Sequence, residues 1–146
     1  MNPTENKDLV RRYVKALDSH DIEAAVALVA DDLVNHAAIP EAQGAAGMRR
    51  IFGKMLKAFP DQRVSCEDVI AEGDRVACRV SMRGTNTGPI EFVRAPLPAT
   101  GKPVSSEALH LFRVAGGKIV EHWAGRDDFG MLRQLGHAPF ATAVQS

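Results

Sequence analysis

Apolar side chains in the first part of the chain recur every three to four residues, which is the spacing of an amphipathic helix. The first such stripe covers residues 9–17, and either Thr4 or Asn6 is placed to cap the helix. Asp21 follows a polar break and can start a second, shorter helix over residues 22–29. The pattern therefore predicts two helices in a tight hairpin.

A third apolar stripe, the most regular in the chain, covers residues 48–59 and stops at Pro60. It predicts a third helix. Residues 33–37, which lie between the hairpin and this helix, are expected to form a short extended segment.

Beyond Pro60 the period changes from helical to alternating, which is typical of β-strands. Residues 64–82 fit a β-hairpin, and a second hairpin joins residues 104–114 to residues 118–127, before a short helix over residues 129–136. Residues 84–101 between the hairpins have no sustained period. They are expected to form a long connection of the kind that often serves as a lid or pocket wall.

This order of elements predicts an α+β fold in a single domain over residues 1–146, with helices packed on one face of a meandering antiparallel sheet. Along the third strand, Ala108, His110 and Phe112 alternate with Leu109 and Leu111, so both faces of the sheet are partly apolar. Because the helices cover only one face, we expect a homodimer or a higher homo-oligomer through the other.

The 146 residues include 18 basic and 18 acidic side chains, so the net charge is zero. This balance argues against nucleic acid or an anionic membrane as a partner. The polar start of the chain is unlike a signal peptide, and no apolar run reaches the ~18 residues of a membrane span. Cys66 and Cys78 lack metal-ligand spacing and are expected to be reduced core thiols, which favours a cytoplasmic protein.

Asp127 is the leading candidate for acid/base chemistry, which requires a carboxylate in an apolar setting. It ends an alternating strand in which Trp123 and Gly125 are expected to share its face, while Asp128 points elsewhere or caps the next helix. The alternative is that both aspartates only mark the start of that helix.

His110 lies on the face of its strand that also carries Phe112, and pairing about the Gly116-Gly117 turn brings it near Trp123. A histidine in this setting is either a hydrogen-bonded core residue or a donor to a carbonyl oxygen. Three further polar candidates remain, each with a structural alternative: Asn35 and His36 on a segment expected to pass the pocket rim, and Tyr13 on the apolar face of the first helix.

Several other sites are excluded, since the chain contains no HExxH, GxSxG or GxxxxGK[ST] motif. The five histidines show no ligand spacing, so no metal site is expected.

Two segments resemble a known family: residues 117–123, GKIVEHW, and residues 127–136, DDFGMLRQLG. Together they resemble the C-terminal signature of the SnoaL-like polyketide cyclases, which belong to the nuclear-transport-factor-2-like superfamily. The likeness extends over nearly the whole chain and includes Asn35-His36 and Phe59-Pro60-Asp61.

The resemblance implies a cone in which a curved antiparallel sheet wraps around three helices and encloses a deep, mostly apolar pocket. The general acid/base of the family maps to Asp127, its facing histidine to His110 and its asparagine to Asn35. The implied reaction is an intramolecular aldol condensation of a small, hydrophobic carbonyl compound without metal or cofactor. Ala108 departs from the polar residue expected at its position, which puts a large polycyclic ester in doubt as the substrate.

Three alternatives stay open. A ketosteroid-isomerase-like enzyme would match Tyr13, but the segment at Asn35 supplies no carboxylate base. An epoxide hydrolase would need an Asp-Arg-Asp set that includes Asp127. A non-catalytic module that binds a hydrophobic metabolite would leave Asp127 without a chemical role.

Overall fold

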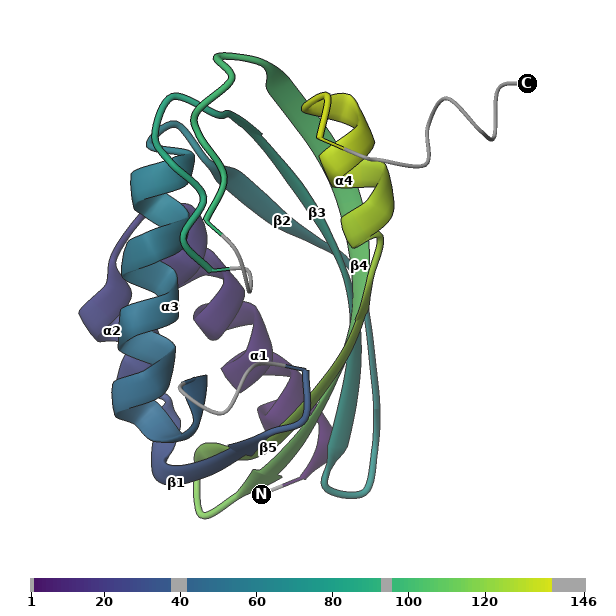
Figure 1. The fold of residues 1–146 in the computed structure, drawn as a ribbon. Helices are drawn as coiled ribbons and strands as arrows, with labels where there is room; N and C mark the ends of the chain where they lie inside the picture. The colour runs from purple at the N-terminus through teal and green to yellow at the C-terminus, as the bar shows by residue number, and fades with distance from the viewer. Residues whose placement is uncertain (1, 38–41, 93–95, 138–146) are drawn as a thin grey trace.

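The structure is a computed structural model that describes residues 2–37, 42–92 and 96–137. Three helices pack against the concave face of a twisted sheet, and the C-terminal helix lies beside one end of it (Figure 1). In chain order the elements are α1 (Pro3–Asp18), α2 (Ile22–Val26), β1 (Val29–Asn35), α3 (Gly44–Ala58), β2 (Arg63–Glu72), β3 (Arg75–Thr85), β4 (Pro103–Ala115), β5 (Lys118–Arg126) and α4 (Asp128–Gln134).

The five strands form one sheet in the order β1-β5-β4-β3-β2. The pairs from β2 to β5 are antiparallel, as expected, whereas β1 runs parallel to β5. The predicted α+β fold is therefore confirmed, and the sheet is mixed rather than wholly antiparallel. Parallel strands require a long crossover, and here the chain between β1 and β5 contains α3 and the other three strands.

The ends of the first two helices depend on which side chains cap them. Asn2 caps α1 through a capping box with Glu5, so the predicted caps Thr4 and Asn6 are wrong and lie inside the helix. Asp21 caps α2 as predicted, by accepting from the backbone N–H of Ala24 at 3.0 Å. The helix ends at Val26, earlier than expected, because β1 already begins at Val29.

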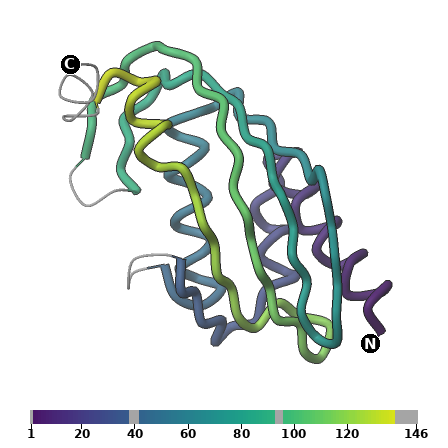
Figure 2. The backbone as a smooth tube through the Cα atoms, turned by 90° about the vertical axis from the view of Figure 1, so that its right-hand side faces the viewer, coloured from purple at the N-terminus to yellow at the C-terminus, as the bar shows by residue number. Residues whose placement is uncertain are grey.

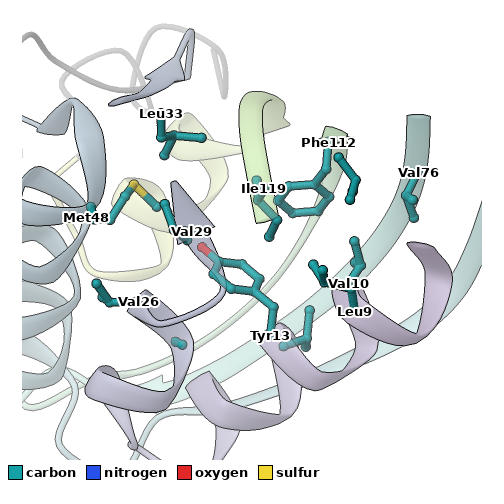
Figure 3. Packing of buried hydrophobic residues seen from close by; sticks show 14 of the residues in the cluster. Leu9, Val10, Tyr13, Val26, Val29, Leu33, Met48, Val76, Phe112 and Ile119 are labelled. Atoms are coloured by element: carbon teal, nitrogen blue, oxygen red, sulfur yellow. The ribbon is translucent and has the colours of Figure 1, made fainter. Parts of the chain in front are cut away.

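The main core lies between the helices and the concave face of the sheet. In Figure 3 the ring of Tyr13 reaches from α1 toward Val29 and Phe112, which belong to the sheet. The convex face has no helix over it among the described residues (Figure 2), and Ile70 and Leu109 there are 68% and 64% exposed.

The connection between β3 and β4 packs at the end of the molecule where α4 lies. Its residues 93–95 lie outside the described ranges. Ile90 and Leu97 pair across it, and Asn86 is fully buried within it. Its described residues from Asn86 onward do not line the cavity discussed below, so among them the expected pocket wall is not found.

Cys66 and Cys78 are free thiols whose sulfur atoms lie 2.8 Å apart across β2 and β3. Cys78 is buried, whereas Cys66 is only half-buried. Burial raises the pKa of the Cys78 thiol, so it stays protonated near neutral pH. No helix in the described ranges is long and apolar enough to cross a membrane.

Candidate active site

A mostly apolar cavity of about 180 Å³ lies between α1, α3 and the concave face of the sheet. Its apolar walls come from α1, α3 and the sheet, and the part from α3 includes Met48, Phe52 and Met55. Its polar groups come mainly from β1, β4, β5 and the start of α4. A concave apolar space with a few convergent polar groups is the usual form of a ligand site.

Asn35, His122 and His110 form a hydrogen-bonded row along one wall of this cavity. Oδ1 of Asn35 lies 3.1 Å from Nδ1 of His122, and Nε2 of His122 lies 2.8 Å from Nδ1 of His110. Asn35 is anchored in turn by Gln43, whose side chain bonds to both the N–H and the C=O of Asn35 at 2.8 Å. The row joins the end of β1 to the middle of β4 through β5.

Both imidazoles are neutral near pH 7. Burial is the main cause that lowers the pKa of His110 to about 4 and that of His122 to about 3. The positive charge of Arg126 lowers both pKa values further. Phe112 lies parallel to the two rings, with centroids 4.8 Å from that of His122 and 5.8 Å from that of His110.

A bulge in β5 decides which of its side chains face the cavity, because the β4–β5 ladder skips Val120. Without the skip, the Gly-Gly turn would place Trp123 opposite His110, as the sequence analysis expected. With it, Ala124 pairs with His110 and the side chain of His122 faces the cavity. A shift of one residue exchanges the two faces of a strand, which is why His122 was missed.

Trp123 therefore lies on the other face of the sheet, away from the cavity. The prediction that Trp123 and Asp127 share a face is wrong, because Asp127 lines the cavity and Trp123 does not. The indole stacks on His36 with centroids 4.9 Å apart, and the guanidinium of Arg75 lies 5.0 Å from its centroid. His36 also pairs with Glu121 at 2.7 Å. The structure thus does not bring Trp123 and His36, two expected ligand contacts, into the cavity.

Asp127 does line the cavity, together with His110, but at its exposed edge. Its carboxylate caps α4 by accepting from the N–H of Gly130 at 2.8 Å. The neighbouring Asp128, considered as the cap in the sequence analysis, instead begins the helix and lies 3.6 Å from Arg126. Asp127 therefore lines the cavity, but its carboxylate caps a helix at an exposed position and does not have the apolar setting expected from the sequence.

Tyr13 and Phe112 both line the cavity, in line with the sequence analysis. Their rings meet edge to face with centroids 5.7 Å apart. Burial raises the pKa of the Tyr13 phenol above its usual range, so the hydroxyl stays protonated at any physiological pH.

Besides His122, the polar residues of the cavity that were not predicted from the sequence include Gln62 and Arg126. Gln62 is 4% exposed, and its Oε1 has no hydrogen-bond partner within the described ranges. Arg126 donates to the carbonyl oxygen of Ala37 at 3.0 Å. Arg126 shares the face of His122 only because of the bulge, since the unbroken alternation would place it on the opposite face. Gln62 lies between α3 and β2, and no pattern in the sequence pointed to it. Among the described residues, no three His, Cys, Asp or Glu side chains gather as metal ligands would.

Residues 7–135 match the sequence profile of the SnoaL-like polyketide cyclases, so the chain belongs to this family. Aklanonic acid methyl ester cyclase DauD of Streptomyces sp. (strain C5) is 29% identical over 134 residues, which cover 88% of this chain and 80% of that protein. The resemblance found in the sequence is thus confirmed, as is the expectation of an enzyme of the cyclase kind.

Solved structures of similar proteins agree with the fold. AclR of Streptomyces galilaeus, a proposed hydroxylase, is 30% identical with a TM-score of 0.79, over 94% of this chain and 100% of its own. IdmH of Streptomyces antibioticus, a proposed polyketide cyclase, is 33% identical with a TM-score of 0.74, over 90% of this chain and 98% of its own.

Proposed function

We propose that this protein is a cofactor-independent cyclase that closes a ring in a small to medium carbonyl compound by an intramolecular aldol reaction. The observation that carries the proposal is one mostly apolar cavity lined by both Asp127 and His110. The family supports the reaction class, because its curated relatives are named as cyclases of aklanonic acid methyl ester.

In the proposed reaction, Asp127 takes a proton from a carbon atom that adjacent carbonyl groups make acidic. The electron pair left on that carbon forms a bond to the carbon of a second carbonyl group in the same molecule. The oxygen of that group then takes the proton back from Asp127, so the product is an isomer of the substrate. His110 holds a polar group of the substrate, and Asn35 acts through its hydrogen bond with His122.

The size of the cavity bears on the substrate. About 180 Å³ is below the ~300–1,000 Å³ of pockets that enclose drug-sized ligands, so a compact substrate fits better than a polycyclic one. Ala108 lines the cavity as well, at the position where the resemblance to the family would place a polar side chain. The wall formed by β4 therefore lacks that polar group.

The test is turnover by Asp127→Asn, with tethered 1,3-diketones that carry a further ketone as the compact substrate and aklanonic acid methyl ester as the polycyclic one. The natural chain should cyclise the compact substrate faster, in keeping with the size of the cavity. Asparagine caps helices as well as aspartate does, so α4 is retained while the base is lost. We expect ring closure by the natural chain and a ~10²–10⁴-fold lower rate in the variant. Asp32→Asn, which removes an exposed carboxylate of β1 that does not line the cavity, is the matched control and should keep the rate.

If neither substrate is cyclised but both bind, the proposal fails and a non-catalytic binding module is the better description. Equal rates for Asp127→Asn and the natural chain would remove Asp127 from the mechanism.

A second candidate, epoxide hydrolysis, is favoured by one observation: Arg126, Asp127 and Asp128 all line the cavity, and Arg126 lies 3.6 Å from Asp128. Diol formation from styrene oxide, abolished by Arg126→Gln, would support this activity. The absence of diol formation would exclude it for this epoxide.

We also propose a homodimer that buries the convex face of the sheet, because Leu109 and Ile70 expose apolar side chains there. Sedimentation should give twice the mass of one chain, and Leu109→Glu should shift it toward the monomer. A monomeric natural chain would overturn this proposal.

We further propose that the protein acts in the cytoplasm, because an oxidising compartment would join two thiols that lie as close as Cys66 and Cys78. Free thiols are blocked as the cells are opened and then counted, and both cysteines should be found reduced. A disulfide between them would contradict the proposal.

A further inference from the structure

The backbone N–H of Ala37 sets the direction of the hydrogen bonds that run to the cavity. It donates to Oδ1 of Asn35 at 3.0 Å, which identifies that atom as the amide oxygen, a group that only accepts. Nδ2 of the same amide donates to the sulfur of Met48 at 3.1 Å. Because Nδ1 of His122 lies 3.1 Å from the amide oxygen, that nitrogen must carry a proton.

A neutral imidazole has one N–H and one lone pair. With Nδ1 of His122 protonated, its Nε2 holds the lone pair and accepts from the atom 2.8 Å away, which is Nδ1 of His110. His110 thus spends its single proton on His122. Its Nε2 is left with a lone pair, and this ring lines the cavity.

Packing keeps both rings in this arrangement. The planes of His110 and His122 are within 10° of each other with centroids 5.1 Å apart, so the rings meet edge to edge, as the hydrogen bond requires. Phe112 lies parallel to both rings. Rotation of either imidazole by half a turn would break the hydrogen bond between the two rings. Rotation of His122 would also break its bond to Asn35.

Burial, and after it the nearby positive charges, keeps both rings neutral. The positive charge of Arg126 lowers the pKa of both imidazoles and so disfavours their protonation. His36 has the same effect on His122. Glu107, Asp127 and Asp128 line the cavity as well, but within the described ranges no carboxylate is hydrogen-bonded to either ring. A row that ends in a neutral amide orients the imidazoles without stabilising an imidazolium.

We propose that His122 is a positioning residue that fixes the proton of His110 on Nδ1, so that His110 offers the ligand a hydrogen-bond acceptor. The group of the substrate that meets His110 is then an enol or phenol O–H, and not the carbonyl oxygen expected from the sequence. This deepens the proposed function, on which it rests for taking the cavity as the substrate site.

The first test needs no substrate. Two-bond ¹H–¹⁵N correlation spectra of the ¹⁵N-labelled natural chain near pH 7 report which imidazole nitrogen carries the proton. We expect Nδ1–H for both His110 and His122. In His122→Phe, which keeps an aromatic ring beside Phe112, His110 loses its acceptor and its proton should no longer be confined to Nδ1. Nε2–H at His110 in the natural chain would overturn the proposal, even if no variant folds.

The second test compares binding of 2-naphthol and 2-methoxynaphthalene, in which a methyl group replaces the hydroxyl hydrogen and so removes the donor. The natural chain should bind 2-naphthol ~3–10-fold more tightly, the range for a single neutral hydrogen bond. His122→Phe should lose this preference. His36→Phe changes a histidine on the other face and should keep it.

Equal binding of the two probes by the natural chain, or an unchanged preference in His122→Phe, would overturn the proposal. The outcome is separate from that of the proposed function. Nδ1–H at His110 without any ring closure would remove the cyclase and leave the acceptor role in place.

Discussion

Asp127 and Gly130 fit each other at the start of α4: the carboxylate accepts from the N–H of Gly130 at 2.8 Å, and a Cβ atom on Gly130 would overlap that carboxylate. The glycine is needed because the cap approaches so closely. The same contact sets the direction of the carboxylate at the edge of the cavity.

Gly130→Ala should therefore displace Asp127 and lose its cap, at a cost of ~1 kcal/mol or more in the free energy of unfolding. If Asp127 is the base, turnover should fall as well. Gly125→Ala is the matched control, since a Cβ there meets no atom within 4 Å. Urea unfolding of both variants checks the prediction, and equal stabilities would contradict it.

Acid should weaken the fold through the two histidines of the cavity. Their pKa values in the folded chain are about 4 for His110 and about 3 for His122, against ~6.5 when unfolded. As the pH falls below ~6.5, the unfolded chain takes up protons that the folded chain does not, so stability declines. For each histidine the slope approaches ~1.4 kcal/mol per pH unit, until the pH reaches the folded pKa.

Urea unfolding between about pH 7 and about pH 5 measures this decline above the range in which the carboxylates titrate. His122→Phe cannot take up this proton and should show a shallower decline than the natural chain. Equal slopes for the two proteins would show that His122 is already accessible to protons in the fold.

Asn86 should be essential to the connection between β3 and β4. Its fully buried amide donates to the carbonyl oxygens of Ala58 and Gly88 and accepts from both N–H and Oγ1 of Thr100. Asn86→Ala leaves these groups without partners, so we expect a loss of ~3 kcal/mol or more. Thr87→Ala, at an exposed neighbouring position, should change stability by less than ~0.5 kcal/mol.

Limited proteolysis provides the second readout for Asn86, because cleavage should move into the connection in Asn86→Ala but not in Thr87→Ala. Resistance equal to that of the natural chain would mean that the apolar contacts of Ile90 hold the connection by themselves.

Tyr13→Phe should leave the free energy of unfolding within ~0.5 kcal/mol of the natural value, since both ring contacts, with Phe52 and Phe112, are retained. Tyr13→Ala should cost ~3–5 kcal/mol because it opens a hole in the core. Chemical unfolding of the two variants separates ring from hydroxyl. A loss above ~1 kcal/mol in Tyr13→Phe would show that the hydroxyl is hydrogen-bonded in the fold.

Short-range signals predicted much of this molecule. Asp21 was identified as a cap, and the alternation along β4 correctly grouped Ala108, His110 and Phe112 on one face of the strand, which the structure shows to be the cavity side. The cap of α1 was also readable, because Asn2 precedes Pro3 and stands three residues before Glu5, but a site closer to the apolar stripe was preferred.

Two features had no such signal. The bulge at Val120 depends on packing between strands, yet it exchanges Trp123 for His122 at the cavity wall. The parallel pairing of β1 with β5 depends on where the helices and the rest of the sheet leave an open edge. Without it, Asn35 and His122 could not be seen from the sequence as partners.

That pairing also bears on the order in which the protein folds. Asn35 and His122 are 87 positions apart, so the wall that holds the two imidazoles is completed only after most of the chain has been synthesised. Contacts between distant segments form slowly, because the intervening chain must first be ordered. A nascent chain that stops before β5 would already contain the apolar side chains of α1 and α3, but it would lack the strand that completes the cavity wall. Pairing of the C-terminal hairpin with β1 is therefore the event that completes the cavity.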